Sequence, residues 1–573
     1  MRFRWQVPAG SAVPQGAGPE AIVAHLLARR GYTAADEIAA FLAPTPATLG
    51  DPAQLADLEP AVARLLLARR RGEPIAIWGD YDVDGLTSTA LLCRALGGMG
   101  FAVRPHIPHR VRDGYGLNVA GIDALAASGI TLLIAVDCGI SNRAEIAHAR
   151  TLGLDTIVLD HHTLPPQLPE AAAVVNPRRP DCAYPCKDLA AVGVAYTLVR
   201  ALVREGLRLR GAWDEDEADL LDLLELAALG TVADVAPLCG ENRTIVAWGL
   251  DSLRHTGHPG LRALCNVAGI APARLNAWDI GHALGPRLNA AGRIADAAPA
   301  LRLLLCDDPG EALALAQDLD RLNRERQKEL GRVLEEATAL IESGGTLDDR
   351  RPILQIAGEG WTAGVVGLVA GRLAERYGRP AIVLERGREF SRGSARSIDG
   401  FNLVEALAEC ADLLDHYGGH AKAAGLTVAN GKLEALQERL LTLARARLSA
   451  DDLRPALTVD LDLALADCSY PTVEAIERLA PFGHGNPEPL LLLRDVTPRW
   501  PRLSGDGKHC FFTAAAQGGQ PVRAPARCVA FGQGDRCAEL QRGPLDVVGT
   551  LRREWWQGEE RLSFHVRDFR AAS

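Results

Sequence analysis

Three aspartates occupy alternate positions in one short segment of the chain, namely Asp80, Asp82 and Asp84. Carboxylates this close to one another repel unless a cation neutralises them, so their spacing indicates a metal site. A solvated acidic turn is the alternative interpretation of the same segment. A calcium-binding EF-hand is excluded, because the position at which that motif needs its final glutamate is occupied by Leu91.

The elements that must position these acids are a buried strand and a helix. Residues 74–78 form a short apolar run that predicts the strand, and residues 86–96 have the pattern of the helix. Gly79 and Gly85 flank the acids and allow the backbone to turn tightly. Open α/β sheets bind ligands at the carboxyl ends of their strands, which is where these acids are expected.

Two further strands are expected to end on residues of the same chemical kind. The apolar run 132–136 is followed by Asp137, and the run 156–159 is followed by Asp160, His161 and His162. One strand-end aspartate is usually a helix cap or a turn former. Three strand ends that meet at one sheet edge instead predict a single site of carboxylate and imidazole ligands.

Asp234 is a fourth candidate ligand. It follows a helical pattern over residues 219–228 and lies among apolar residues, where an unpaired charge is costly. Considered alone, this aspartate would be structural. Considered together with the other acids, it is interpreted as a further metal ligand.

The composition narrows the class of protein. A chain of 573 residues has room for three or four domains. The net charge of −10 argues against a general polyanion-coating protein but allows a local basic groove. The twelve cysteines include no CxxC pair, so we expect no zinc site, no disulfide framework and a cytoplasmic location. The start lacks an apolar signal sequence, and the longest apolar stretch contains acids, so no membrane segment is expected.

Other segments offer contacts for an anionic ligand. The loop 104–116 is rich in arginine and histidine, and its Arg110 and Tyr115 suit phosphate and base contacts, although a solvated loop is the alternative. Arg287 lies on a glycine-flanked turn that suits an anion, with a surface salt bridge as the alternative.

The second half of the chain predicts a long helix and a second α/β domain. Residues 309–343 repeat apolar positions at helical spacing, and this helix either bridges two domains or packs along one. Strands are expected at 353–357 and 381–385, with a helix over 364–377 between them.

Glycine-rich segments follow in the same domain. Ser394 and Arg396 lie in one of them, and Gly419 and His420 lie in an expected turn. Backbone N–H groups in such segments can approach a phosphate closely, and His420 is either a substrate contact or a structural residue.

From about residue 455 the pattern changes to five short strands, which predicts an OB-like barrel. Arg552, Arg553, Trp555 and Trp556 either form a platform for a single nucleic-acid strand or, for the tryptophans, belong to the core. The pair Gln557-Gly558 indicates a hairpin.

Taken in order, these motifs resemble a known family. The segment 80–85, the lone Asp137, the Asp160-His161-His162 triplet and the segment 230–234 resemble the signature of the DHH phosphoesterase superfamily. The segment 418–425 is similar to the GGHxxAAG motif of its DHHA1 domain. Within the superfamily the chain resembles the RecJ family of single-strand-specific exonucleases, over residues 70 to 570.

The resemblance implies an α/β multidomain fold. It comprises an N-terminal helical cap (1–72), a parallel-sheet DHH catalytic domain (73–300), a long connecting helix (301–345), an α/β DHHA1 domain (346–450) and a C-terminal OB-like β-barrel that binds DNA (451–573).

The resemblance also implies an activity, which is 5′→3′ hydrolysis of single-stranded DNA to 5′-mononucleotides in recombination and repair. Two divalent cations, Mn²⁺ or Mg²⁺, would be the cofactors. The implied partners are single-stranded DNA and single-strand-binding protein, and the chain is expected to be a monomer. Alternatives are a small-oligonucleotide or cyclic-dinucleotide phosphodiesterase of the same superfamily, an inorganic pyrophosphatase, and a non-catalytic DNA-binding replication scaffold.

The implied roles fall on specific residues. Asp137 would bridge the two metals, His162 would meet the phosphate, and Asp160 would orient the neighbouring histidine. The metal ligands would be Asp80, Asp82, Asp84, Asp137, His161 and Asp234. The substrate contacts would be Arg110, Tyr115, Arg287, Ser394, Arg396, Gly419 and His420.

Overall fold

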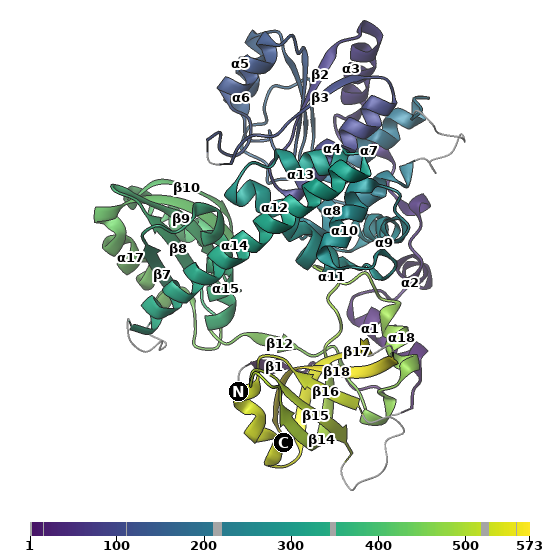
Figure 1. The fold of residues 1–573 in the computed structure, drawn as a ribbon, viewed down its shortest axis with the longest axis vertical. Helices are drawn as coiled ribbons and strands as arrows, with labels where there is room; N and C mark the ends of the chain where they lie inside the picture. Colours follow the sequence, from purple (N-terminus) through teal and green to yellow (C-terminus); the bar gives the residue numbers. More distant parts are fainter. Residues whose placement is uncertain are drawn as a thin grey trace. The chain divides into compact units, whose positions relative to one another are not determined.

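The computed structural model describes residues 3–572 except 15, 111, 210–219, 344–350, 517–525 and 557–558, and it leaves out the side chains of 526, 555 and 556. The chain forms two units (Figure 1). Unit 1 comprises Met1–Leu42, Lys328–Ala480 and Glu488–Ser573, and unit 2 comprises Ala43–Gln327 and Pro481–Pro487. Among the described residues, no helix has both the length and the apolarity that crossing a bilayer requires.

Unit 2 is built on a parallel sheet with the strand order β3-β2-β4-β5-β6. Its strands are β2 (Pro74–Trp78), β3 (Ala102–His106), β4 (Leu132–Val136), β5 (Asp155–Leu159) and β6 (Ala173–Val175). The expected strand ends lie side by side, because Trp78 pairs with Ala135 and Val136 pairs with Leu159. The predicted parallel sheet is therefore confirmed, and its strands are continuous apolar runs because both faces are covered.

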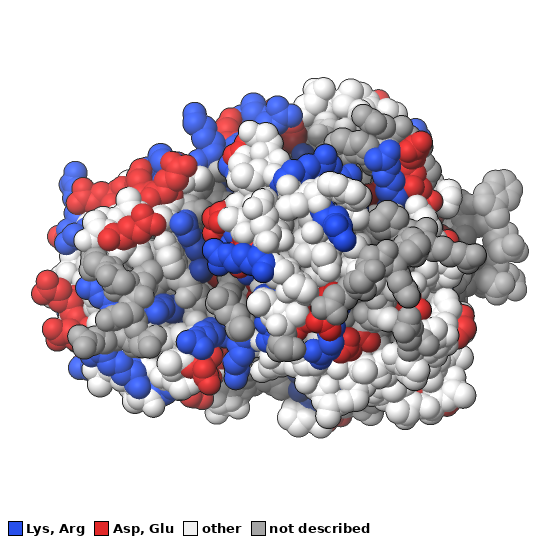
Figure 2. Space-filling model, turned by 90° about the horizontal axis from the view of Figure 1, so that it is seen from below, with Lys and Arg blue, Asp and Glu red and all other residues white. Residues whose placement is uncertain are grey.

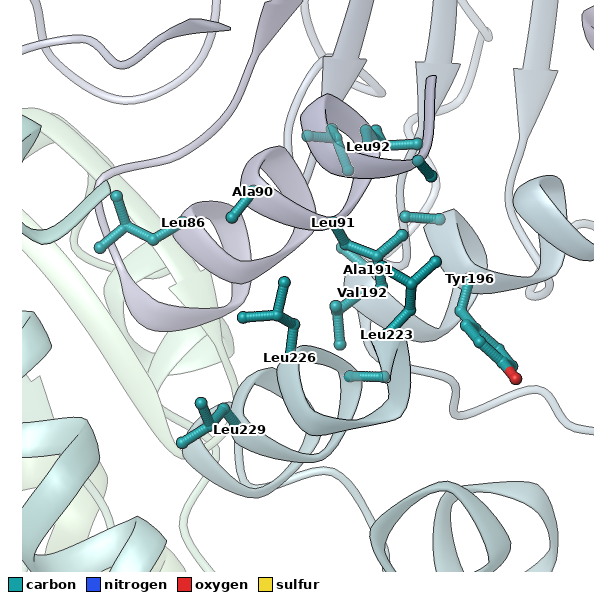
Figure 3. Packing of buried hydrophobic residues seen from close by; sticks show 14 of the residues in the cluster. Leu86, Ala90, Leu91, Leu92, Ala191, Val192, Tyr196, Leu223, Leu226 and Leu229 are labelled. Carbon is teal, nitrogen blue, oxygen red and sulfur yellow. The ribbon is translucent and has the colours of Figure 1, made fainter. Parts of the chain in front are cut away.

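Helices cover both faces of this sheet (Figure 1). Ile75 and Ile77 pack on one face with α3 (Leu58–Arg71), α4 (Val83–Gly98), α7 (Ala191–Arg204) and α8 (Leu223–Ala233). Ala76 and Trp78 pack on the other face with α5 (Val119–Ala127) and α6 (Arg143–Thr151). Figure 3 shows α4, α7 and α8 joined by Leu91, Val192 and Leu226. The unit is completed by α9 (Gly240–Arg254), α10 (Pro259–Ala268), α11 (Ala277–Asp279), α12 (Gly285–Ile294) and α13 (Ala298–Leu305).

The predicted long helix is α14 (Pro309–Ser343), with the expected bounds. Its residues up to Gln327 belong to unit 2, and those from Lys328 belong to unit 1. Leu315 and Leu319 enter the core of unit 2, whereas Val333 packs on the sheet of unit 1. The helix therefore contributes to both cores, as a connecting helix must.

The α/β domain of unit 1 has the strand order β10-β11-β9-β8-β7. The strands β7 (Leu354–Gly358) and β8 (Ala381–Arg386) are parallel, and β9 (Phe390–Arg396), β10 (Leu414–His420) and β11 (Ala423–Ala429) are antiparallel. Helices α15 (Ala363–Tyr377), α16 (Leu403–Ala408) and α17 (Leu433–Arg447) pack on the sheet. The turn expected at Gly419 and His420 is wrong, because both residues pair with β11 as part of β10.

The predicted C-terminal barrel is present. Its strands are β14 (Leu491–Leu503), β15 (Cys510–Ala515), β16 (Ala526–Ala530), β17 (Leu545–Trp556) and β18 (Glu559–Ala571), and the pairing of β14 with β17 closes it. The short β13 (Leu461–Asp462) extends the sheet. Arg552 and Arg553 bond to Glu488 and Glu477. The expected roles of the Trp555 and Trp556 side chains, and the hairpin at 557–558, lie outside the described residues.

The N-terminal region differs from the single helical cap expected over residues 1–72. Strand β1 (Arg4–Gln6) pairs with β12 (Ala456–Thr458), and α1 (Pro19–Arg29) contacts α18 (Tyr470–Glu477). The indole N–H of Trp5 also donates to Asp568 at 2.8 Å. Residues up to Leu42, including α2 (Ala35–Leu42), therefore belong with unit 1, whereas the rest of the expected cap belongs with unit 2.

Candidate metal centre

Asp80 and Asp82 lie in the turn between β2 and α4. Helix α4 begins at Val83, earlier than expected, because Asp82 caps it by accepting hydrogen bonds from the backbone N–H groups of Asp84 (3.0 Å) and Gly85 (3.2 Å). A Cβ on Gly85 would lie 2.5 Å from the backbone nitrogen of Asp80. The turn therefore needs this glycine for space, since any side chain would push Asp80 out of place.

Asp84 lies inside the first turn of α4 and is fully buried. Its carboxylate accepts hydrogen bonds from the backbone N–H groups of Ala191 (2.7 Å) and Val192 (2.9 Å), at the start of α7. A helix N-terminus suits a carboxylate because its N–H groups and dipole are positive there. A Cβ on Gly230 of α8 would come within 2.9 Å of the same carboxylate, so three helices meet at this group.

Asp137 has a φ of 62° immediately after β4, a conformation that aspartate tolerates better than most residues. One of its carboxylate oxygens lies 3.3 Å from Nε2 of His161. Carboxylate oxygens of Asp84 and Asp234 lie 3.8 Å and 3.7 Å from the two ring nitrogens of the same histidine. Asp234 caps the C-terminus of α8, which ends later in the chain than expected, and the helix end positions its carboxylate.

The six expected ligands fall into overlapping sets. The ligand atoms of each set lie within 4.8 Å of one another, and the sets are Asp80, Asp82 and Asp137; Asp84, His161 and Asp234; and Asp137, His161 and His162. Asp137 belongs to two sets and lies against His161 of the remaining one. The arrangement can hold two cations side by side with Asp137 next to both.

The electrostatics of the cluster require positive charge. Burial, reinforced by the neighbouring carboxylates, raises the pKa of Asp84 to about 7 and that of Asp234 to about 8. The same causes raise the pKa values of Asp80 and Asp137 well above their ordinary values. Burial lowers the pKa of His161 to about 4, so the imidazole is neutral and available as a ligand.

Two buried atoms in the centre are left without a hydrogen-bond partner, namely Oδ1 of Asp80 and Nε2 of His161. Buried polar atoms are almost always satisfied, so such orphans need an explanation. Oxygen-rich sites with one imidazole are typical of Mn²⁺ and Mg²⁺, and the residues present therefore fit such ions.

Asp160 is placed to orient the His162 ring rather than to bind a metal ion. Its Oδ1 accepts hydrogen bonds from the backbone N–H groups of His161 (2.8 Å) and His162 (3.0 Å) and from Nδ1 of His162 (2.8 Å). Its Oδ2 accepts one from the N–H of Ile140 (3.0 Å). Burial opposes ionisation, yet the bond from His162 holds the pKa of Asp160 below its usual value. Burial also opposes protonation of His162, but the Asp160 carboxylate raises the pKa of this histidine to about 9.

Tyr115 and Arg110 lie beside the centre. The Tyr115 hydroxyl donates to the carbonyl of Asp137 at 3.1 Å and lies 3.3 Å from Nδ1 of His162, while its ring is 52% exposed. The Arg110 guanidinium lies 4.0 Å over the Tyr81 ring, in the acidic turn. These two expected substrate residues are therefore close to the metal ligands.

The contacts of Arg287 differ from those expected of a residue that binds a phosphate. Its Nε donates to Asp320 of α14 at 3.0 Å, and its Nη1 donates to the carbonyl of Ala283 at 2.8 Å. Only 15% of the arginine side chain and 9% of the aspartate side chain are exposed. The structure therefore favours the salt-bridge alternative, although the pair is largely buried rather than on the surface.

The remaining expected substrate residues form a second cluster in unit 1. Arg396 of β9 and His420 of β10 lie on the two strands that flank β11, and both pair with Ala423 of that strand. Ser394 Oγ and Arg396 Nη2 face Gly367 of α15, where a Cβ would lie 3.2 Å and 3.4 Å from them. Burial lowers the pKa of the Arg396 guanidinium.

Sequence reasoning missed an exposed aromatic and basic surface on the barrel. Trp500 is 78% exposed and lies in a bulge of β14 between Arg499 and Arg502. Arg502 also lies 5.9 Å from the ring of Phe511 on β15. The sequence signal was an arginine on either side of a tryptophan and a proline, which is a composition typical of single-strand contacts.

Three family models match separate segments of this chain. The model of the DHH family, N-terminal domain, matches residues 74–231, the DHHA1 domain matches 351–448, and the RecJ OB domain matches 459–568. The single-stranded-DNA-specific exonuclease RecJ of Bacillus subtilis is 38% identical over 555 residues, which cover 96% of this chain and 67% of that protein. The chain belongs to the RecJ family.

Solved structures of RecJ agree with this assignment. A crystal structure of RecJ in complex with Mn²⁺, from Thermus thermophilus, matches with a TM-score of 0.82 and 33% identity, covering 100% of this chain and 80% of that one. The corresponding structure with Mg²⁺ has a TM-score of 0.77 and 31% identity, with coverage of 100% and 79%. The expected RecJ family fold, from the DHH domain to the OB-like barrel, is confirmed.

Proposed function

We propose that this RecJ family member is a metal-dependent exonuclease that hydrolyses single-stranded DNA from the 5′ end and releases 5′-mononucleotides, in recombination and repair. The observation that carries the proposal is the convergence of Asp137 and His161 with carboxylates from the carboxyl ends of β2 and β4, the first turn of α4 and the end of α8. The fold and the curated relatives support the same class of enzyme.

Two divalent cations, Mn²⁺ or Mg²⁺, are the proposed cofactors. Asp80 and Asp82 would hold one ion, Asp84, His161 and Asp234 would hold the other, and Asp137 would contact both. Bound there, the pair supplies Lewis-acid polarisation of the scissile phosphate and a nucleophilic water at neutral pH.

His162 and its neighbours handle the phosphate. The Nδ1 of His162 is engaged by Asp160 and lies close to the Tyr115 hydroxyl, so Nε2 is the nitrogen left to face the substrate. Because the Asp160 carboxylate keeps this imidazole protonated near neutral pH, Nε2 would donate to a phosphate oxygen and stabilise its charge. The Tyr115 hydroxyl lies 3.3 Å from Nδ1 of His162 and also donates to the carbonyl of Asp137, so Tyr115 helps to hold the His162 ring in place.

The strand is bound by cationic and glycine-rich surfaces. Arg110 and Tyr115 would contact the nucleotide at the metal centre, and the cluster of Ser394, Arg396, Gly419 and His420 would take the 5′ phosphate. The surface around Trp500 would stack on bases of the strand. The net charge of −10 does not exclude binding of a DNA strand. Figure 2 shows Lys and Arg side chains interspersed with acids on the face that it draws.

We also propose domain boundaries, a cellular location and a partner for this protein. The DHH domain, the connecting helix, the DHHA1 domain and the barrel would be separated at residues 300, 345 and 450, as expected from the sequence. The N-terminal residues up to Leu42 are assigned to unit 1. The protein would act as a cytoplasmic monomer and meet single-strand-binding protein on its substrate.

One assay tests the proposal. Single strands labelled at either end are incubated with Mn²⁺, Mg²⁺ or EDTA, next to a duplex and a dinucleotide. We expect metal-dependent release of labelled mononucleotide from the 5′ end of the single strand and little cleavage of the duplex. Preference for the dinucleotide would favour a small-oligonucleotide phosphodiesterase, and binding without cleavage would favour the scaffold.

A further inference from the structure

Trp278 is exposed to an unusual degree for an indole. In unit 2, as far as its residues are described, only Val235 among the large apolar side chains is more open than this tryptophan, with 62% against 59% of the surface exposed. The tryptophan lies in α11, directly before a π-helical turn (Ile280–Leu284) that continues into α12. Single π-helical turns inside helices are frequent at functional sites.

His282 holds the indole in a fixed position. The two rings are stacked with their centroids 4.5 Å apart and 7° between their planes. The Nδ1–H of His282 donates to the backbone carbonyl of Trp278 at 3.0 Å, which fixes the imidazole in turn. One face of the indole is thus covered by the imidazole, while 59% of the residue's surface stays exposed. A rigid flat surface of this kind loses little entropy when another ring stacks on it.

The helix that carries this stack lies along the rim of the candidate metal centre. A Cβ on Gly285 would lie 3.5 Å from the Cβ of Ala233, in the last turn of α8, directly before Asp234. At the other end of α12, a Cβ on Gly292 would lie 2.7 Å from the carbonyl of Tyr81, between the first two acids.

Val235 flanks the same aspartate. It has a φ of 60°, which is a strained conformation for a β-branched residue. The backbone N–H of Val235 donates to the carbonyl of Val232 at 3.1 Å, and the N–H of Ala236 donates to the carbonyl of Thr231 at 3.2 Å. These two hydrogen bonds form a motif that ends many helices, and glycine is the usual residue at the position that Val235 occupies. Strain of this kind persists mainly at functional sites, and here it holds an apolar side chain open beside Asp234.

We propose that Trp278, backed by His282, stacks on one nucleobase of the strand whose phosphodiester lies at the metal centre, and that Val235 contacts the same nucleotide. This inference rests on the proposed function and adds a positioning role to it. Every base has a π-face, so stacking holds a strand in register without selecting its sequence. An exonuclease that advances along any sequence needs that kind of contact.

The test combines protein variants with abasic substrates. Strands of about 12 thymidylates with a 5′ phosphate carry one abasic nucleotide at successive positions. On the intact strand, Trp278→Ala should lower kcat/KM about tenfold, and Trp278→Tyr should restore most of it. At one position the abasic site should cost wild type a similar factor but cost Trp278→Ala nothing further, because both changes remove the same contact.

A structural role for Trp278 would instead give additive losses at every position. Additivity throughout, or an unchanged kcat/KM for Trp278→Ala, would overturn the inference. The matched control is Leu152→Ala, which removes another exposed apolar side chain of unit 2 and should keep the wild-type abasic profile.

A second measurement does not depend on cleavage. In EDTA, the oligothymidylate should quench indole fluorescence more in wild type than in Trp278→Tyr, and an equal change in both proteins would contradict the stacking. If wild type binds and quenches but does not degrade the strand, the proposed function fails while the stacking contact stands. If wild type degrades the strand and the quenching difference is absent, the stacking contact alone fails.

Discussion

The Nδ1–H of His162 donates to the Asp160 carboxylate at 2.8 Å, although the two residues are separated by only one other in the chain. Backbone N–H groups, including that of Ile140 in the neighbouring strand-end loop, saturate the rest of this carboxylate. The aspartate is therefore a fixed negative charge that sets both the direction and the protonation of one imidazole.

Asp160→Asn should remove the charge and one acceptor, because the amide oxygen can still accept from His162 but the amide N–H₂ cannot accept the bond that Oδ2 accepts from Ile140. We expect kcat to fall by roughly 10–100-fold with a smaller change in KM, because the imidazole loses orientation and positive charge. The pKa of His162, raised to about 9 in wild type, should fall, so that activity declines at a lower pH. Asp155→Asn, an exposed aspartate at the other end of β5, is the control. Unchanged kinetics for Asp160→Asn would remove the orienting role.

Asp137→Asn should abolish cleavage while leaving the fold intact. Asparagine accepts the φ of 62° at this position, so the backbone should not change. Because a neutral amide replaces a carboxyl whose ionisation the buried cluster disfavours, the metal-free variant should melt at a higher temperature than metal-free wild type. Calorimetry in EDTA and titration with Mn²⁺ measure both effects. Full activity with saturating Mn²⁺ would refute the assignment of this ligand.

Stability without metal should depend on pH. The pKa of Asp84 is raised to about 7 and that of Asp234 to about 8, whereas both are about 3.9 in an unfolded chain. The folded state therefore keeps protons that the unfolded chain has released, and stability falls as the pH rises from about 4 to about 8.

Metal ions displace these protons, so the gain in melting temperature on adding Mn²⁺ should be larger at about pH 8 than at about pH 5.5. Calorimetric scans with Mn²⁺ and with EDTA across this range give the comparison. A gain that is the same at every pH would show that these carboxylates do not bind the ion.

Arg396→Ala should weaken the use of a 5′-phosphorylated strand. A charge-assisted hydrogen bond contributes about 1.5–3 kcal/mol, so the preference of wild type for the phosphorylated over the hydroxyl end should exceed about tenfold and should vanish in the variant. Competition between the two strands measures the preference. Arg392→Ala, an exposed arginine on the same strand, should retain it. Equal rates on both strands in wild type would remove this role.

Arg287→Ala and Asp320→Ala should both destabilise unit 2. Leaving a buried charge unpaired costs about 3–5 kcal/mol. Asp320→Ala leaves Arg287 without its carboxylate, whereas Arg287→Ala should cost less than that, because Asp320 keeps a second ion pair with Arg324 at 2.6 Å. A double-mutant cycle should show coupling between positions 287 and 320. KM for single-stranded DNA should change little. Arg321→Ala removes an exposed arginine from the same helix and should leave the stability nearly unchanged. A raised KM at unchanged stability would restore the phosphate-contact interpretation.

The sequence by itself determined the parallel sheet, the long helix and the order of the candidate ligands. The runs 74–78 and 132–136 were recognisable because strands buried on both faces are continuously apolar, and β2 and β4 have those bounds. Helix α14 was recognisable because its apolar positions recur at helical spacing over many turns. Since parallel strands end at one edge, the meeting of Asp80, Asp137 and His161 followed from the pattern.

The tertiary structure alone decided which distant groups pair. It joined Arg287 to Asp320, placed the carboxylate of Asp84 on the first turn of α7, and paired Arg4 with Ala456. It also placed His420 on a strand and left Trp278 exposed against His282. Periodicity records which face of an element is apolar, but it does not record which other surface meets that face. Contacts between residues far apart in the chain are fixed only when whole elements pack.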